Sequence, residues 1–239
     1  MPSPDQPICN VCGGNEFATV RGRVNAKCKG CNSLERTRLM WLYIDRIPLD
    51  EQSRVLHIAP ERGIAQRLTQ VLAPDNYVIA DLDPSRYADL AATCQPIDLC
   101  DLGAWPNDEF DVIIHSHVIE HVPCTVAYPL FHLQRMLKPT GSHVAIVPFM
   151  SGRYDESLQE LTEDERNVRF GQFDHVRRFG VDDRETHLGK LMRLPDEYDA
   201  TTDFDEATLR TANIPESEWR GYGISTVMVW GKDDWLLTA

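Results

Sequence analysis

Three features are scarce in this 239-residue chain, and each scarcity argues against a class of protein. No uninterrupted apolar run approaches the roughly 20 residues that a membrane-spanning helix needs. Basic residues are outnumbered, with 24 Lys and Arg against 37 Asp and Glu, and a uniformly acidic surface would repel the phosphates of a nucleic acid. The first residues, 1–5, have neither the basic nor the apolar region of a secretion signal. We therefore expect a cytoplasmic protein without a membrane segment.

The composition that is present is that of a globular protein, and its charge is unevenly divided. Hydrophobic residues make up 42% of the chain and charged residues 26%, which is enough for one large domain with a small appendage. Residues 1–40 hold six basic and three acidic side chains, whereas the remainder carries a net charge of −16. A basic head on an acidic body suggests two units with different roles, although the head can equally be a small solvated module.

Four cysteines in the head have the spacing of a metal site. Cys9 and Cys12 form one C-x-x-C pair, Cys28 and Cys31 form another, and fifteen residues separate the pairs. Four thiolates complete a tetrahedron around zinc and leave no open position, so one structural zinc ion is expected. Two redox-active motifs or disulfides are the alternative, which a cytosolic setting disfavours. A ribbon of this size is too small to fold by its core alone, so the metal would supply folding energy.

The rest of the chain alternates strand and helix patterns. We expect a zinc ribbon over residues 1–33, a connecting helix over 34–50, and a main domain over 51–239. Helices are expected at 61–73, 124–138 and 182–193, and strands at 53–59, 76–81, 96–97, 110–116, 142–148, 200–204 and 224–230. This alternation predicts an α/β fold with a doubly wound, mostly parallel, seven-stranded Rossmann-like sheet. Such sheets bind ligands at the carboxyl ends of their strands.

Residues 149–190 break this pattern. They are polar, charged and aromatic, with weak periodicity, and an insert of this length in a compact domain is usually functional or disordered. Phe170, Phe173 and Phe179 argue against disorder. We expect this insert to be a lid over the substrate.

Several motifs in the main domain resemble those of one enzyme class. They are Val-Leu-His-Ile-Ala-Pro-Glu-Arg-Gly at 55–63, an acid ending the second strand at 81, His-Ser-His-Val-Ile-Glu-His-Val at 115–122, Leu-Lys-Pro-Thr-Gly at 137–141, and Phe-Gly-Gln-Phe-Asp-His-Val-Arg-Arg-Phe-Gly at 170–180. Together with the alternating pattern, they resemble class I S-adenosylmethionine-dependent methyltransferases, and more narrowly the methyltransferase-11 type preceded by a zinc ribbon. The first motif departs from the family's glycine-rich form, because only Gly63 remains as a clear glycine.

The resemblance implies a set of cofactor-binding residues. Asp81 would accept hydrogen bonds from the ribose hydroxyls, unless it is only a turn or cap acid, in which case Asp83 is the alternative. Asp98 would meet the adenine amino group, unless it is only a surface acid. The first motif would contact the methionine part of the cofactor. The implied set is His57, Ala59, Pro60, Glu61, Gly63, Asp81, Leu82, Asp98, Leu99 and His115.

The segment His117–His121 also spells the H-x-x-E-H pattern of a zinc-peptidase class. That pattern requires both histidines on one helix, whereas His117 follows a strand here, so the methyltransferase interpretation is favoured. In that interpretation His115 and His117 lie near the sulfonium, and Glu120 and His121 brace the next turn.

The insert supplies the candidate catalytic and substrate-binding residues. His175 beside Asp174 can be held in one tautomer and act as a base, with His117 as the other candidate base. Arg177 and Arg178, together with Tyr154, could bind an acidic substrate. An ion-paired lid without a ligand role is the alternative.

The resemblance therefore implies methyl transfer from S-adenosylmethionine to an oxygen or nitrogen of a small, possibly anionic metabolite. Two alternatives remain: an RNA-modifying methyltransferase that grips phosphates with its basic ribbon, and a non-catalytic module whose altered first motif no longer binds the cofactor.

Overall fold

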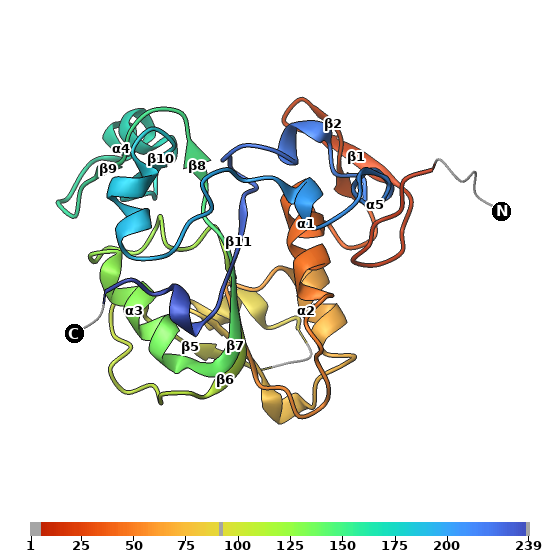
Figure 1. The fold of residues 1–239 in the computed structure, drawn as a ribbon, viewed down its shortest axis with the longest axis horizontal. Helices are drawn as coiled ribbons and strands as arrows, with labels where there is room; N and C mark the ends of the chain where they lie inside the picture. Colours follow the sequence, from red (N-terminus) through yellow and green to blue (C-terminus); the bar gives the residue numbers. More distant parts are fainter. Residues whose placement is uncertain (1–5, 91–92, 238–239) are drawn as a thin grey trace.

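The computed structural model describes residues 6–90 and 93–237. Figure 1 shows a small N-terminal ribbon, a central layered domain and a second small unit. The ribbon contains β1 (Phe17–Val20) and β2 (Arg23–Cys28), and the second unit contains β9 (Asp155–Glu156), α4 (Glu163–Phe170) and β10 (Arg177–Gly180). Helix α1 runs from the ribbon down to the central domain (Figure 1). Among the described residues, no helix is both long and apolar enough to cross a bilayer.

A six-stranded sheet forms the centre of the molecule, with strand order β11-β7-β6-β3-β4-β5. Its strands are β3 (Val55–Ile58), β4 (Tyr77–Asp81), β5 (Cys94–Pro96), β6 (Phe110–Ser116), β7 (Leu137–Ile146) and β11 (Val227–Trp230). All neighbours are parallel except β11, which is antiparallel to β7. The chain moves outward from β3 to β5 and then returns to place β6 beside β3. This reversal is the topological switch point, where open α/β sheets bind ligands.

Both faces of the sheet are covered by helices, which are α1 (Glu35–Ile44), α2 (Arg62–Leu68) and α3 (Ala127–Met136). Alternate residues of each strand enter opposite cores because side chains of a strand alternate between faces. Val55 packs in a cluster with Leu39 of α1 and Ile64 of α2, whereas its neighbour Leu56 packs with Leu133 of α3 on the other face. The predicted doubly wound arrangement is present.

The prediction of a seventh strand at 200–204 is wrong. This segment contains a 3-10 turn, Ala200–Thr202, in place of a strand. The cause is local: the carboxylate of Asp199 accepts hydrogen bonds from the backbone N–H and the hydroxyl of Thr201, at 2.8 and 2.6 Å, which favours a turn over an extended strand. The helix expected at 182–193 is likewise replaced by two 3-10 turns, Arg184–Thr186 and Leu188–Lys190.

The insert at 149–190 is a folded unit. Strands β8 (Phe149–Met150), β9 (Asp155–Glu156) and β10 (Arg177–Gly180) form a small sheet in the order β8-β10-β9, and α4 (Glu163–Phe170) packs beside β10. Gly180 is required where the unit closes on itself, because a Cβ at this position would come within 2.3 Å of the Arg153 backbone. Of the three phenylalanines that argued against disorder in the insert, Phe170 and Phe179 are buried, but Phe173 is 51% exposed.

Two histidines on neighbouring strands lie entirely inside the sheet. His115 of β6 and His143 of β7 are fully buried, and their ring centroids are 5.0 Å apart. Burial lowers the pKa of His143 well below its usual value of 6.5, because an imidazolium would lose its hydration there. Both imidazoles are therefore neutral in the folded protein.

Because His143 is buried and neutral, we expect the folded protein to lose stability in mild acid. Below about pH 6.5 the unfolded chain binds a proton at this residue and the folded chain does not, so the free energy of unfolding decreases as the pH falls and is unaffected above that range. We expect His143→Gln to reduce the slope of the free energy of unfolding against pH by about 1.4 kcal/mol per pH unit at pH values well below 6.5. Urea denaturation at a series of pH values measures this slope. His187→Gln at a 41% exposed side chain is the control. Equal slopes for His143→Gln and the wild type would contradict this account.

Candidate cofactor cleft and metal centre

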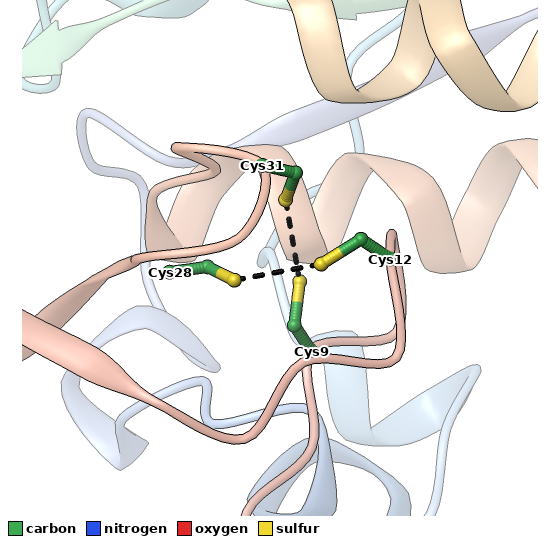
Figure 2. Close-up of side chains that lie close together, drawn as sticks. All are labelled: Cys9, Cys12, Cys28 and Cys31. Atoms are coloured by element: carbon green, nitrogen blue, oxygen red, sulfur yellow. Dashed lines mark hydrogen bonds between the residues drawn. The ribbon is translucent and has the colours of Figure 1, made fainter.

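The four cysteines of the head converge on one point. Figure 2 shows their sulfur atoms facing one another, with 3.6 Å between Sγ of Cys9 and Cys31 and 3.5 Å between Sγ of Cys12 and Cys28. All four Sγ atoms lie within 4.8 Å of one another, and none is in a disulfide. Zinc–sulfur bonds of about 2.3 Å at tetrahedral angles place sulfur atoms about 3.8 Å apart. The cluster is therefore compatible with a zinc ribbon, whose strands are β1 (Phe17–Val20) and β2 (Arg23–Cys28).

Arg38 of α1 ties this ribbon to the rest of the protein. Its guanidinium is fully buried and donates to four backbone carbonyls, those of Ala26, Ser33, Ala212 and Asn213. The positive charge of Arg38 also offsets the negative charge that the cysteine sulfur atoms carry as thiolates, because these sulfurs are close enough to attract its guanidinium.

A cleft of about 510 Å³ opens at the carboxyl ends of β3, β4, β5 and β6. The residues that line it follow these four strands or come from α1 and the insert. They include Arg36, Ala59, Pro60, Glu61, Asp81, Leu82, Asp98, Leu99, His117, His121, Gln172 and Asp174. The volume is within the range of small-molecule and cofactor sites.

Asp81 ends β4 and is almost fully buried against the cleft. One carboxylate oxygen accepts the backbone N–H of Asp83 at 2.8 Å, and the other accepts the hydroxyl of Tyr87 at 3.2 Å. These two contacts fix the plane of the carboxylate, and each oxygen retains a further lone pair for a ligand hydroxyl.

Comparisons with known proteins agree with this architecture. No family model matches the chain, and no curated protein matches its sequence. One solved structure, the complex of the Haloferax volcanii Trm112 methyltransferase activator with a protein described as a methyltransferase, is 15% identical, covers 81% of this chain and 88% of that chain, and has a TM-score of 0.50. The fold is that of a class I methyltransferase. The likeness shows the fold and does not extend to the narrower methyltransferase-11 family.

Two further structures are more distant. The YcgJ protein of Bacillus subtilis is 18% identical, with 75% of this chain and 79% of that chain covered and a TM-score of 0.47. A SAM-dependent methyltransferase from Archaeoglobus fulgidus is 19% identical, with 49% and 55% covered and a TM-score of 0.38.

The first motif of this methyltransferase fold lies between β3 and α2. Ala59 has a φ of 48°, the left-handed conformation that glycine usually adopts, so this alanine holds a strained backbone conformation. Pro60 and Glu61 follow and line the cleft. Gly63 does not line it: a Cβ there would lie 3.1 Å from Val11 and 3.2 Å from Cys31, so this glycine lets α2 pack closely against the ribbon.

Two residues of opposite charge, Glu61 and Arg36, line the same cleft. Glu61 accepts from His57, with 3.1 Å between Oε2 and Nε2. Burial would raise the pKa of Glu61, but the contacts with His57 and Ser116 outweigh it and hold the pKa below its usual value. Arg36 of α1 lines the same cleft, and burial lowers the pKa of its guanidinium. Sequence reasoning missed Arg36 as a site residue, because no motif joins α1 to the loop after β3.

Residues after β4 and β5 form one wall of the cleft. Leu82 is 74% exposed within the cleft and Leu99 is buried beside it. Asp98 is exposed and accepts the backbone N–H of Cys100 at 2.8 Å. An exposed leucine and a nearby carboxylate can hold the face and the amino group of a flat heteroaromatic ring.

A second cluster of titratable groups follows β6 and meets the insert. His117 has a φ of 54°, its Nε2 is 2.9 Å from the carbonyl oxygen of Ile224, and its Nδ1 is 3.3 Å from Glu120. His121 Nδ1 is 3.3 Å from Asp174. The expected pairing of Asp174 with His175 is thus replaced, since His175 Nδ1 lies 3.3 Å from the carbonyl oxygen of Phe170.

The remaining candidate residues lie outside the cleft lining. His57 is buried beneath Glu61 and contacts the Tyr77 hydroxyl at 2.8 Å. His115 is fully buried within the sheet. Tyr154 stacks on His187, with ring centroids 4.3 Å apart.

The two insert arginines differ sharply. Arg177 is fully buried, and its guanidinium donates to Glu156 and to the carbonyl oxygens of Ile119 and Cys124. Arg178 is half-buried, and within the described part of the chain it makes one hydrogen bond, to the carbonyl oxygen of Arg153 at 3.2 Å. Neither lines the cleft. Internal contacts therefore use the donors of Arg177 that were expected to bind a substrate, whereas Arg178 uses only one of its donors in this way.

Proposed function

We propose that this protein is an S-adenosylmethionine-dependent methyltransferase that acts on an oxygen or nitrogen of a small metabolite. The observation that carries the proposal is the cleft at the switch point, with the fixed carboxylate of Asp81 at the end of its second strand. The neighbour's fold supports it as well.

The residues present fit the cofactor along its length. Asp81 would accept the ribose hydroxyls, and Leu82 and Leu99 would hold the adenine, with Asp98 near its amino group. At the other end, Glu61 and Arg36 offer one negative and one positive group, which match the ammonium and carboxylate of the methionine part. When bound, the cofactor supplies a methyl carbon activated by a positively charged sulfur, so the protein needs only to align the acceptor and exclude water.

His117 is the best-placed base. The carbonyl oxygen of Ile224 accepts a hydrogen from its Nε2, which leaves the Nδ1 lone pair to take a proton from the acceptor. Glu120 beside Nδ1 would stabilise the imidazolium that forms. By taking that proton, His117 would leave the acceptor oxygen or nitrogen with a free lone pair for the methyl group that the cofactor would supply.

The charges of the ribbon favour a small acceptor over RNA. Arg38 is buried, Arg36 faces the cleft, and the pairs Arg23–Glu35 and Lys29–Glu16 are closed at 3.0 and 3.2 Å. Most of the basic residues in the head are thus buried, in the cleft or paired with a carboxylate, and few remain to neutralise phosphates.

Calorimetric titration with S-adenosylhomocysteine tests the proposal. We expect binding to the wild type and a loss of roughly ten- to hundredfold in affinity for Asp81→Asn, because the amide replaces a charged acceptor of two hydroxyl hydrogens. Asp83→Asn is the matched control, since that acid caps the following turn through Ser85 and does not line the cleft. No heat with the wild type at millimolar ligand would instead favour the non-catalytic module.

A further inference from the structure

The cluster after β6 contains a buried carboxylate that the methyl-transfer proposal does not fully explain. Glu120 is 1% exposed, and among the described residues no group except His117 is placed to donate a hydrogen to its carboxylate oxygens. Its one ionic contact among the described residues is with His117, at 3.3 Å. An unsatisfied buried carboxylate is costly unless a cation compensates it.

Two further imidazoles face this carboxylate. One ligand atom each of Glu120, His121 and His175 lie within 4.8 Å of one another, and the rings of His121 and His175 meet edge to face with 4.6 Å between centroids. The three residues come from two separate segments, the turn after β6 and the loop after α4. The backbone N–H of Val176 joins these segments by donating to the Glu120 carbonyl oxygen at 3.0 Å.

Both imidazoles have the outer contacts that orient metal-binding histidines. Nδ1 of His121 lies 3.3 Å from the Asp174 carboxylate, and Nδ1 of His175 lies 3.3 Å from the Phe170 carbonyl oxygen. An acceptor at Nδ1 places the hydrogen there and leaves the lone pair on Nε2. Carboxylate–histidine and carbonyl–histidine contacts of this kind fix the tautomer of a ligand in metal sites.

We propose that Glu120, His121 and His175 bind one divalent transition-metal ion at the edge of the cleft. Two imidazoles and one carboxylate suit zinc, iron or manganese and leave coordination positions open. His121 also lines the cleft, so an open position would be accessible from it. An anionic oxygen of the acceptor would occupy that position; this last role rests on the proposed function, whereas the metal site does not.

Metal stoichiometry of the full-length protein tests the site. After saturation with zinc and removal of loosely bound metal, we expect two zinc ions per wild-type chain, one in the four-cysteine site and one here, and a single ion in Glu120→Gln. His187→Gln at the protein surface should retain both ions. Elemental analysis against protein concentration provides the ratio.

Manganese provides a second measurement that the thiolate site does not disturb, since carboxylate and imidazole ligands suit this ion better than thiolates do. Protein already loaded at the four cysteines should bind one Mn²⁺, detected by loss of the free-ion electron paramagnetic resonance signal, and His175→Asn should bind none. One zinc ion per wild-type chain together with no Mn²⁺ binding would overturn the proposal and leave a Glu120–His117 ion pair. Neither measurement uses S-adenosylhomocysteine, so failure of the metal site and failure of cofactor binding are distinguishable.

Discussion

Removal of the zinc ion that we expect at Cys9, Cys12, Cys28 and Cys31 should unfold the ribbon and weaken the binding of S-adenosylhomocysteine at the cleft. Structural zinc contributes on the order of 10 kcal/mol to small metal-dependent modules. The two strands of the ribbon have four and six residues, and they bury too little apolar surface to compensate for that loss.

The effect should reach the cleft because α2 begins there and packs against the ribbon. Gly63 lies one residue beyond the start of α2 and contacts Val11 and Cys31 of the ribbon. Arg36, which lines the cleft, is on α1 directly after the last cysteine. Unfolding of the ribbon would therefore free α1, which carries the cleft residue Arg36, and would expose the start of α2 beside the cleft.

We expect Cys12→Ser to lower zinc retention, to remove a cooperative part of the thermal transition, and to reduce affinity for S-adenosylhomocysteine by about tenfold or more, that is by at least about 1.4 kcal/mol. Cys94→Ser, at a cysteine outside the cluster, is the control. Circular dichroism and calorimetry provide the two readouts. A Cys12→Ser protein that melts and binds like Cys94→Ser would show that the ribbon folds without its metal.

The residues after the strands were predictable from sequence. Asp81 and His117 follow apolar runs that form β4 and β6, and the carboxyl ends of parallel strands meet at one edge. The same reasoning placed Asp98 and Leu99, which also line the cleft. The four-cysteine cluster was predictable too, because spacing alone constrains two C-x-x-C turns.

Side-chain partners across separate elements were not predictable. Arg36 reaches the cleft from the connecting helix, and Gly63 serves the contact with the ribbon. Asp174 is next to His175 in sequence but contacts His121. Each of these depends on how two elements pack, which neither composition nor periodicity determines.

Arg177→Met is expected to destabilise the protein by about 3 to 5 kcal/mol, because a buried ion pair loses one partner. Its guanidinium joins the insert to the turn that carries Glu120: it donates to Glu156 of β9, at 2.8 Å, and to the carbonyl oxygen of Ile119. Methionine fills part of the volume but leaves these acceptors without a donor.

Arg178→Met provides the matched comparison. Arg178 is the next residue in the chain, and its guanidinium makes a single hydrogen bond to the backbone among the described residues. Arg178 is half-buried and makes one hydrogen bond, so its replacement should cost much less than that of Arg177, about 1 kcal/mol. Chemical denaturation of the two variants separates a structural from a substrate-binding role for Arg177. If Arg177 instead bound an acidic acceptor, Arg177→Met would be as stable as Arg178→Met and would change only the affinity for that acceptor. The burial of Arg177 and its three internal partners favour the structural outcome.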